Sequence, residues 1–322
     1  MCIFSQPVIS VGATRIFACA TTDGKQRLVY QMQYDSPYEN AMILPLPVRT
    51  PASDASLRFI DLQGYGAFFD DLELGFPWEM QRGIGCASPP TNSAAGNLQV
   101  FQVGNYVASF VPRLADFARL DPQFTLPAAT WDEIPGYRDF GFAVFQLAAG
   151  TIEPHPIAFE FETATTDSLY FPTRHIHDGE VHDREEFDHV LYLQHAGFDS
   201  RVYGYQNSDV PDQATGLIRS KYVAGDFCDP AKGSKVIDPD LLVHRRLISG
   251  MAPNDDVRIA TSGHPTRRSM NLRDWLPLAP WALGAVACAW FFSRRARIRK
   301  AAAAEAQVRA QAKASQDDST PS

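Results

Sequence analysis

The sequence predicts an α+β fold dominated by antiparallel β-sheet, with a few short helices and one C-terminal transmembrane helix. Runs of β-branched and aromatic residues recur between turn signals, which is typical of strands. Helical periodicity is not sustained beyond about three turns anywhere before residue 275. An uncharged apolar stretch then follows at residues 275–293. These observations favour a β-rich body followed by a membrane segment.

The first part of the chain predicts paired strands. TRIFACAT and QRLVYQMQY flank TTDGK, whose Asp23-Gly24 pair is a strong hairpin signal. NAMILPLPV continues as an extended run. Its two prolines cannot donate to a ladder, so we expect this run to be an edge strand or to leave the sheet there. Residues 65–82 have helical spacing of apolar side chains as far as Pro77, and residues 86–97 have the composition of a loop.

The remainder of the body alternates strands with short helices. RLADFARL predicts a short amphipathic helix that ends at Asp121-Pro122, and TWDEIPGY predicts a further turn of helix. Strands are expected in LQVFQVGNYVASFV, FGFAVFQLA, IAFEFET, SLYFPTRHIH, DHVLYLQH, RVYGYQN, KYVAG, HRRLISG and DVRIAT. We therefore expect a β-rich globular domain over residues 1–270, in which a break near 196–210 would separate two subdomains.

The C-terminal segments predict a single-pass membrane anchor. Residues 271–293 form the expected transmembrane helix, and residues 294–322 form a basic and then disordered tail. Tryptophans near both ends of the apolar stretch suit interfacial anchoring, and the basic run after it favours a cytoplasmic tail. The globular domain would then be extracytoplasmic. The N-terminus lacks the features of a signal peptide, which favours the opposite orientation.

Charge and cysteine usage exclude some classes of function. The net charge is −8, and the segment from Arg294 onward carries +4, which leaves −12 for the body. An acidic body argues against nucleic-acid binding, which needs basic patches, but it would tolerate a bound cation. The five cysteines are scattered without a CxxC pair, so neither a disulfide framework nor a zinc knuckle is indicated.

The stretch HIHDGEVHDREEFDH, residues 175–189, is the strongest candidate site. With Asp178-Gly179 as a two-residue turn, His175, His177, Glu180 and His182 would share one face of a hairpin. Opposed Cβ atoms in such a hairpin are about 4.5–5.5 Å apart, close enough for imidazoles to converge on zinc or another divalent metal.

Other residues of the stretch have different expected roles. Nearby carboxylates could orient the imidazole rings; they are Asp178, Asp183, Glu185 and Asp188. The alternative is that these polar residues are only the solvated face of a hairpin. His189 shares its strand face with Phe187, Leu191 and Leu193, which predicts a packed core histidine.

Cys2 is the second candidate site. Removal of Met1 would leave a chain that begins with cysteine, whose amine could act as the base for its own thiol. That is the logic of N-terminal-nucleophile amidohydrolases, although the early strands lack the other polar residues that such sites use. A cysteine at this position can also be a small buried hydrophobe.

These features favour a binding or envelope-assembly role over catalysis. No P-loop, GxGxxG, GxSxG, HExxH or EF-hand motif is present. We therefore expect a membrane-anchored domain that binds a protein partner and holds a divalent metal. The alternatives are a metal-dependent hydrolase that uses the histidine-rich stretch and an N-terminal-cysteine amidohydrolase.

Three segments carry a resemblance to a known group of proteins. NAMILPLPV, LQVFQVGNYVASFVPRLADFARLD and GFAVFQLAAG with the later HPIAFEF resemble a bacterial domain-of-unknown-function family. The likeness covers residues 2–195 and the C-terminal segment. It implies a β-rich domain, a signal peptide before a mature Cys-containing end, and a terminal membrane helix. It implies no activity and no site residues. This chain differs in lacking the signal peptide and in having the histidine-rich stretch.

Overall fold

The computed structural model describes residues 3–76, 101–103, 106–152, 154–199, 211, 216–233 and 236–261. Residues Met1–Arg268 form one compact unit, and Ser269–Ser322 form a second unit that lies outside the described residues. Cys2, the strand expected at 201–207, the loop expected at 86–97 and the expected membrane helix at 275–293 also lie outside them. Among the described residues, no helix is long and apolar enough to cross a membrane.

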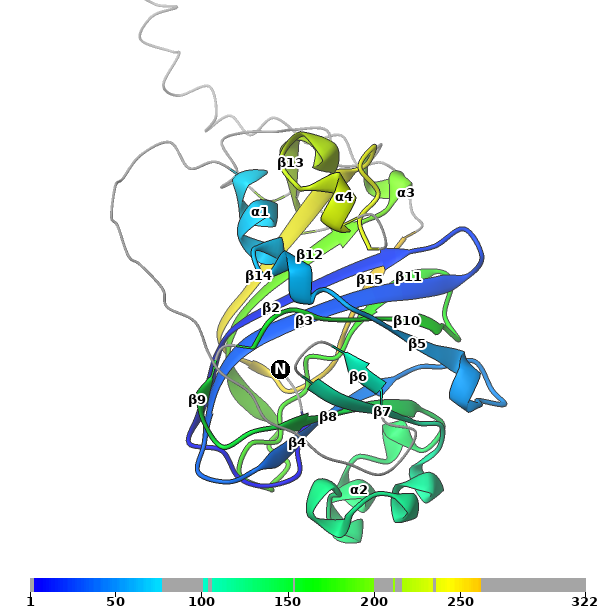
Figure 1. Ribbon diagram of the computed structural model, residues 1–322, viewed down its shortest axis with the longest axis vertical. Helices are drawn as coiled ribbons and strands as arrows, with labels where there is room; N and C mark the ends of the chain where they lie inside the picture. The colour runs from blue at the N-terminus through cyan, green and yellow to red at the C-terminus, as the bar shows by residue number, and fades with distance from the viewer. Residues whose placement is uncertain are drawn as a thin grey trace, which may run out of the picture. The chain divides into compact units, whose positions relative to one another are not determined.

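Strand is the main regular secondary structure of the described chain, as the sequence predicts (Figure 1). The strands are β1 (Ile3–Phe4), β2 (Ser10–Ala20), β3 (Lys25–Ser36), β4 (Asn40–Leu46), β5 (Leu57–Ile60), β6 (Phe101–Val103), β7 (Tyr106–Val111), β8 (Gly141–Leu147), β9 (Gly150–Ile152), β10 (Ile157–Glu162), β11 (Ser168–Phe171), β12 (Arg184–Gln194), β13 (Ile218–Val223), β14 (Leu242–Pro253) and β15 (Val257–Ala260).

The helices are few and short. The α-helices are α1 (Phe68–Leu74), α2 (Ala128–Glu133), α3 (Ala196–Asp199) and α4 (Pro230–Gly233), and the 3₁₀ turns include η3 (Leu114–Arg119), η4 (Pro122–Phe124) and η5 (Pro135–Tyr137). The stretch RLADFARL is thus a 3₁₀ turn. Helix α1 confirms the helix expected within 65–82, and its buried face is made of Phe68, Phe69 and Leu72.

The strands form two large sheets and one small one. The larger has the order β13-β14-β12-β2-β3-β10-β5, with β9 also paired to β3; the second has the order β1-β4-β8-β7-β6; the third pairs β11 with β15. The pairings among these strands are antiparallel apart from β12 with β2, which is parallel. The larger sheet is therefore mixed, because a strand from late in the chain inserts beside β2.

The first predicted hairpin and the predicted strand exit are both present. β2 and β3 pair antiparallel across the Asp23-Gly24 turn, where Gly24 has φ +78°, a conformation that glycine adopts without strain. β4 pairs with β8 along its length, and among the described strands its other edge pairs only with β1, at Met42 and Ile43. Pro45 therefore lies where no donor is needed on that edge, and the strand ends at Leu46.

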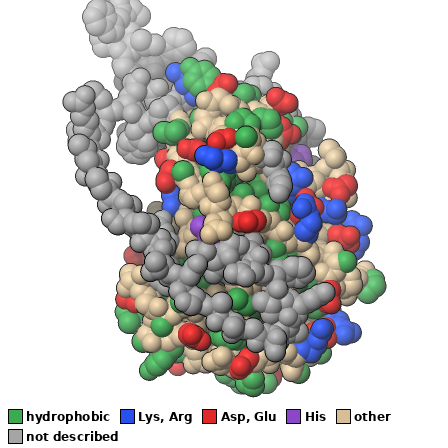
Figure 2. All heavy atoms as spheres, in the orientation of Figure 1, with side chains coloured by type: hydrophobic (Ala, Val, Ile, Leu, Met, Phe, Trp, Pro, Cys, Tyr) green, Lys and Arg blue, Asp and Glu red, His purple; other side chains and the backbone are tan. Residues whose placement is uncertain are grey.

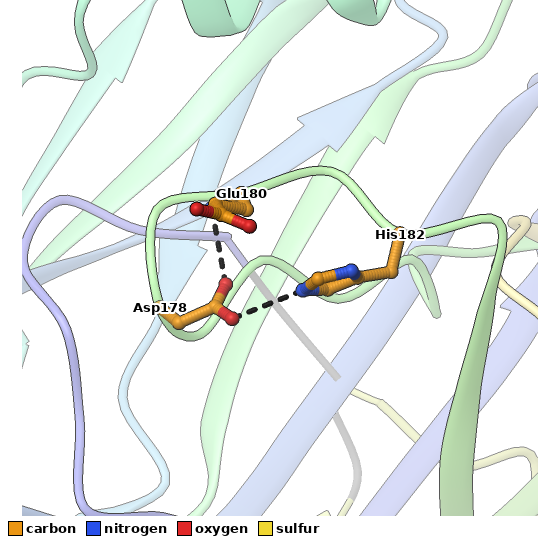
Figure 3. A group of neighbouring side chains, drawn as sticks. All are labelled: Asp178, Glu180 and His182. Atoms are coloured by element: carbon orange, nitrogen blue, oxygen red, sulfur yellow. Dashed lines mark hydrogen bonds and ion pairs between the residues drawn. The ribbon is translucent and has the colours of Figure 1, made fainter.

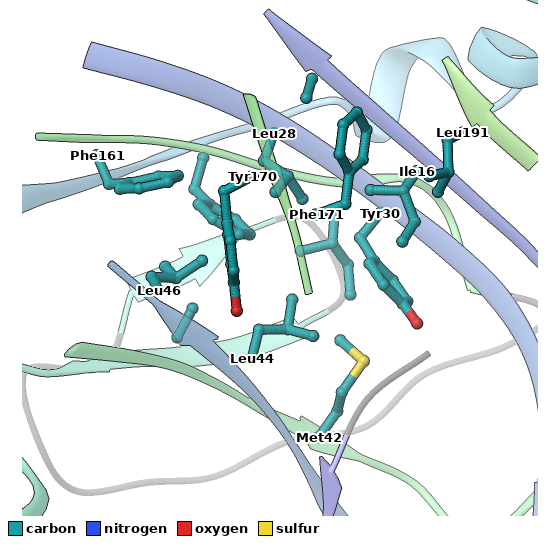
Figure 4. Close-up of a cluster of buried hydrophobic side chains, with 14 of the residues drawn as sticks. Ile16, Leu28, Tyr30, Met42, Leu44, Leu46, Phe161, Tyr170, Phe171 and Leu191 are labelled. Atoms are coloured by element: carbon teal, nitrogen blue, oxygen red, sulfur yellow. The ribbon is translucent and has the colours of Figure 1, made fainter. Parts of the chain in front are cut away.

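Each large sheet is buried on both faces. Alternate residues of β2 divide between two cores: Ile16 packs between the sheets, and Phe17 packs beneath α1. Figure 4 shows the core between the sheets, where Leu28 and Tyr30 of β3 lie opposite Met42 and Leu44 of β4. A third core lies on the outer face of β4 and β8, covered by η3, α2 and η5. The β11–β12 connection is buried at Thr173, His175 and Ile176 and becomes exposed at residues 178–180.

Candidate functional site

The candidate site lies in the loop that joins β11 to β12, and the turn between β14 and β15 holds that loop in place. Asn254 accepts a hydrogen bond from the His175 backbone N–H (2.7 Å), and its amide donates to the His175 and His182 carbonyls (2.9 Å each). Asp256 accepts from the backbone N–H groups of Thr173 (2.9 Å) and Arg174 (3.1 Å). The loop is therefore tied down at both ends by side chains that lie 72 to 83 residues further along the chain.

Asp256 also binds side chains from two other parts of the fold. The hydroxyls of Tyr137 and Tyr170 both donate to its Oδ2 at 2.6 Å. Burial, together with the Asp256 charge, raises the pKa of both tyrosines well above the ordinary value, so they stay protonated as donors. The Asp256 carboxylate thus links three parts of the fold: η5, which covers the second sheet; β11 of the small sheet; and the start of the β11–β12 loop.

Three histidines of this region form a histidine cluster: the buried His175 and His189 and the half-buried His177. The His175 ring lies 5.0 Å from that of His177, 5.1 Å from that of His189 and 4.3 Å from that of Phe187. Burial lowers the pKa of His175 to about 2 and that of His177 to about 4, and it also lowers the pKa of His189. The three imidazoles are therefore neutral at physiological pH.

The middle of the same loop carries an exposed group, here called the tip group: Asp178, Glu180 and His182 (Figure 3). One ligand atom of each residue lies within 4.8 Å of the others. Asp178 Oδ2 lies 3.0 Å from His182 Nε2, and Asp178 Oδ1 accepts the Glu180 backbone N–H at 3.0 Å. Gly179 between them has φ +90°, which allows the backbone to turn sharply enough to bring the two carboxylates together.

The pKa of histidine is shifted in opposite directions in the tip group and in the histidine cluster. The hydrogen bond with Asp178 raises the pKa of His182, and the same bond lowers the pKa of Asp178. A charged pair therefore occupies the tip below the pKa of His182. A metal ion would have to displace that proton, because the metal ligand is the neutral imidazole.

The structure divides the four predicted ligands between these two groups. Glu180 and His182 lie together in the tip group, where Asp178 joins them, and His175 and His177 lie in the histidine cluster. The two-residue hairpin that would have united all four is not formed: β11 ends at Phe171, β12 begins at Arg184, and β11 pairs with β15 instead. Within the described residues, the tip group is the only set whose ligand atoms converge on a potential ion.

Sequence reasoning anticipated some of the residues and missed others. His189 is a packed core histidine, as its strand parity predicts, since it is 1% exposed beside Phe187. Asn254 and Asp256 were not anticipated. Their only local signal is the Asn-Asp-Asp run between two predicted strands, which is a turn signal and does not reveal what the side chains bind.

Comparisons with known proteins give structural likeness only. No protein-family model and no curated protein sequence matches this chain significantly. The crystal structure of baculovirus P35 is similar with a TM-score of 0.45 and 13% identity, over 82% of this chain and 100% of that one. A mutated baculovirus P35 after caspase cleavage has a TM-score of 0.40 and 13% identity, over 77% of this chain and 99% of that one. P35 in the caspase-8/P35 complex gives 0.39 and 13%, over 77% and 96%.

Proposed function

We propose that this chain is a binding protein that carries one divalent metal ion of the zinc type on its tip group. Asp178, Glu180 and His182 offer two carboxylate oxygens and one imidazole nitrogen, a donor set that suits zinc and leaves a fourth position for water or a ligand. The proposal keeps Glu180 and His182 from the set that the sequence predicts. Asp178 takes the place of His175 and His177.

This proposal rests on three ligand atoms that converge on one loop. Side chains from the β14–β15 turn hold that loop in place. Asn254 and Asp256 hold the backbone on both sides of the tip, so little ordering would remain to be done when an ion binds. The side chains of Asp178 and His182 are 57% and 41% exposed, so an ion could enter from solvent. The open coordination position would face solvent too, which suits capture of a donor group from a partner better than enclosed catalysis.

Isothermal titration of the metal-free chain with zinc chloride tests this proposal. We expect one saturable site, and Asp178→Asn, Glu180→Gln and His182→Ala should each weaken zinc binding at least about tenfold. Asp183→Asn is the matched control, because it removes a carboxylate adjacent to His182 that does not belong to the group. Equal zinc binding by wild type and the three tip variants would refute the proposal.

We further propose that residues 275–293 anchor the chain in a membrane, on the basis of the uncharged apolar stretch and the basic residues after it. Two arginines in the stretch, Ala285→Arg with Ala287→Arg, would each cost about 2.5–3.5 kcal/mol on insertion. That variant should move from the carbonate-washed membrane pellet to the soluble fraction. Ala301→Arg with Ala303→Arg, placed beyond the stretch, should leave the protein in the pellet. Release of the unaltered chain by carbonate would contradict the anchor.

A second candidate function, a nucleophilic thiol at Cys2, is favoured by one observation. Cys2 lies outside the described residues, but the next residue, Ile3, is bridged to Ile176, which stands between His175 and His177. A neutral imidazole can accept a thiol proton. The low pKa of both histidines makes them weak bases, so this candidate ranks second.

Alkylation of the chain by iodoacetamide, mapped by mass spectrometry, tests the second candidate. If a histidine activates the thiol, Cys2 should react faster than the buried Cys19 and Cys228, and His177→Phe should slow the reaction at Cys2 alone. A rate at Cys2 that does not change in His177→Phe would exclude the histidine as its base.

A further inference from the structure

The second half of strand β14 is an open edge of the larger sheet. β13 pairs with β14 only as far as Arg245. From there to Pro253, β14 has β12 on one side and, among the described strands, no neighbour on the other. Leu247 and Met251 of this stretch are 56% and 60% exposed, although both are large apolar side chains. A strand edge that is exposed and carries apolar side chains is a template for pairing with another strand.

The hydrogen-bonding pattern shows which backbone groups of this stretch point outward. The Asn254 N–H donates to the Asp183 carbonyl at the end of the β12 ladder (2.9 Å). Bonded pairs alternate in an antiparallel ladder, so even-numbered residues of β14 bond β12 and odd-numbered ones face the other way. Val243 agrees, because its N–H donates to the Ser220 hydroxyl of β13 (3.0 Å). The residues whose N–H and C=O groups face the open edge are therefore Leu247, Ser249 and Met251.

This stretch is complementary to a second copy of itself. Two copies related by a twofold axis at Ser249 would pair antiparallel, with Leu247 of each opposite Met251 of the other. The exposed apolar side chains would then cover each other on one face of the sheet. On the other face, Ile248 would lie opposite Gly250, whose missing side chain leaves room for it. Gly250 has φ +76°, yet the register of β14 with β12 continues through it without a shift.

Two charged side chains favour the same register. Arg246 and Glu185 lie on one face of the β12–β14 pair, both half-buried, and neither makes an ion pair within the described residues. In the paired copies, Arg246 of one would lie opposite Ala252 of the other, and Glu185 stands beside that alanine. The small Ala252 side chain leaves the guanidinium a path to the carboxylate. The twofold axis would create this ion pair twice.

The ends of the open stretch match as well. In this register, Pro253 of one copy would reach the level of Arg245 of the other, where β13 already occupies the edge. Pro253 has no N–H to extend a ladder, and the chain turns away at Asn254, which bonds the β11–β12 loop. The Arg184 guanidinium donates to the Met251 carbonyl (2.8 Å), but that oxygen can accept a second bond.

We infer that the open half of β14 is a self-association edge, through which two copies of this chain pair their larger sheets antiparallel about Ser249. Any extended peptide could make the backbone bonds, but the matched apolar and charged side chains select a second copy. A pair of short strands is small beside the roughly 1,600 Å² of a standard interface, so we expect a reversible dimer. The pairing uses no residue of the tip group, so it goes beyond the proposed function.

Thiol cross-linking of the full chain in mild detergent with EDTA tests this inference, using a bis-methanethiosulfonate with a one-carbon spacer. Ser249→Cys should form a covalent dimer, because the two Cα atoms would lie about 5.5 Å apart. Met251→Cys is the matched control: that position is exposed on the same edge, but its two copies would be offset by about 13 Å along the strands. We expect at least about fivefold more covalent dimer from Ser249→Cys than from Met251→Cys or the wild type.

A mixture of variants and a charge reversal test the register. Leu247→Cys and Met251→Cys should cross-link to each other when mixed, although neither should cross-link alone. In the Ser249→Cys background, Arg246→Glu and Glu185→Arg each place like charges together and should reduce the covalent dimer, and the double variant should restore it. Within one chain the two positions are about 20 Å apart, so this recovery can arise only between copies.

Three results would overturn the inference: no covalent dimer from Ser249→Cys, equal yields from Ser249→Cys and Met251→Cys, or a double charge variant that cross-links no better than the single ones. Absence of zinc binding together with specific cross-linking would refute the proposed function alone. Zinc binding without specific cross-linking would refute the self-association edge alone.

Discussion

Two groups of histidine-bearing residues lie within fifteen positions of the same chain segment and have opposite properties. In the histidine cluster, burial lowers the pKa of His175 to about 2. In the tip group, the hydrogen bond that His182 donates to Asp178 raises the pKa of His182. The same residue type is therefore a neutral packing element at one position and the proton-holding member of an ion pair seven positions later. The difference arises from what surrounds each ring, and the residue type does not determine it.

The cause of the difference lies outside the segment. Asn254 binds the backbone at His175 and at His182, and Asp256 binds it at Thr173 and Arg174. These bonds turn the backbone so that His175 points inward and His182 stays at the surface. On the described part of the face in Figure 2, acidic and basic side chains are interspersed.

Removal of the Asp256 carboxylate should lower the free energy of unfolding more than any other change proposed here, because Asp256 holds the loop that separates the two groups. Asp256→Ala would leave two tyrosine hydroxyls and two backbone N–H groups without their acceptor. We expect the free energy of unfolding to fall by about 3–5 kcal/mol, measured by urea denaturation. Asp255→Ala is the control, because that carboxylate is 70% exposed and bonds only at the surface, to Arg174. A loss of less than about 1 kcal/mol in Asp256→Ala would mean that the loop is held by other contacts.

Acid should destabilise the folded protein through the histidine cluster. The folded pKa values of His175 and His177 lie below the ordinary value of 6.5, so between those limits the unfolded chain binds more protons. Their contribution to stability is therefore complete above pH 6.5 and is lost as the pH falls. Each of these histidines adds up to about 1.4 kcal/mol per pH unit to that slope.

The variant His175→Phe isolates this effect, since phenylalanine suits the aromatic surroundings and cannot be protonated. Urea denaturation at pH 6.5, 6.0 and 5.5 should show a mean slope that is smaller by about 1 kcal/mol per pH unit than in the wild type, because the unfolded histidine is only partly protonated in this range. His182→Gln serves as the control and should not reduce the slope. An unchanged slope in His175→Phe would show that folding does not lower the pKa of this ring.

The turn at Gly179 should contribute less. An alanine there meets no neighbouring atom within 4 Å, so the effect of Gly179→Ala comes from the backbone conformation alone, at φ +90°. We expect a loss of about 1–2 kcal/mol in the free energy of unfolding. Gly66→Ala is the matched control: that position also has open space, but its φ of −58° suits alanine, so stability should be unchanged or slightly greater. Equal effects at the two positions would contradict the assigned turn.

Local sequence signals predicted the parts of the fold that depend on local interactions. The Asp23-Gly24 hairpin and the buried face of β12 follow from turn chemistry and from the two-residue period of strands. The parallel insertion of β12 beside β2 joins residues some 175 positions apart, and no local pattern specifies such a pairing. The burial of His189 was nevertheless predicted correctly. Side chains alternate between the two faces of a strand whichever strand it pairs with.

The candidate site was predicted only in part for the same reason. Asp178-Gly179 does form a sharp turn, but its flanks pair with β14 and β15, or bond the Asn254 side chain, where a hairpin would pair them with each other. Residues 175–177 therefore leave the face that they would have shared with residues 180–182. A strong local turn signal specifies the turn, and remote hydrogen bonds determine which side chains it brings together.

The smallest expected effect is a change in the pKa of His182 in the tip group. The Asp178 hydrogen bond is the largest cause of the raised pKa of His182, and its Coulomb attraction is the next largest, with Glu185 and Glu180 contributing less. In Asp178→Asn, the pKa of His182 measured by NMR titration should return toward 6.5, and Glu180→Gln should lower it by a smaller amount. His175 should show no titration above pH 5 in either variant, because its low pKa arises from burial. If Glu180→Gln lowered the pKa of His182 more than Asp178→Asn does, the carboxylate beside the imidazole in solution would be Glu180. The ion pair would then have to be reassigned to Glu180 and His182.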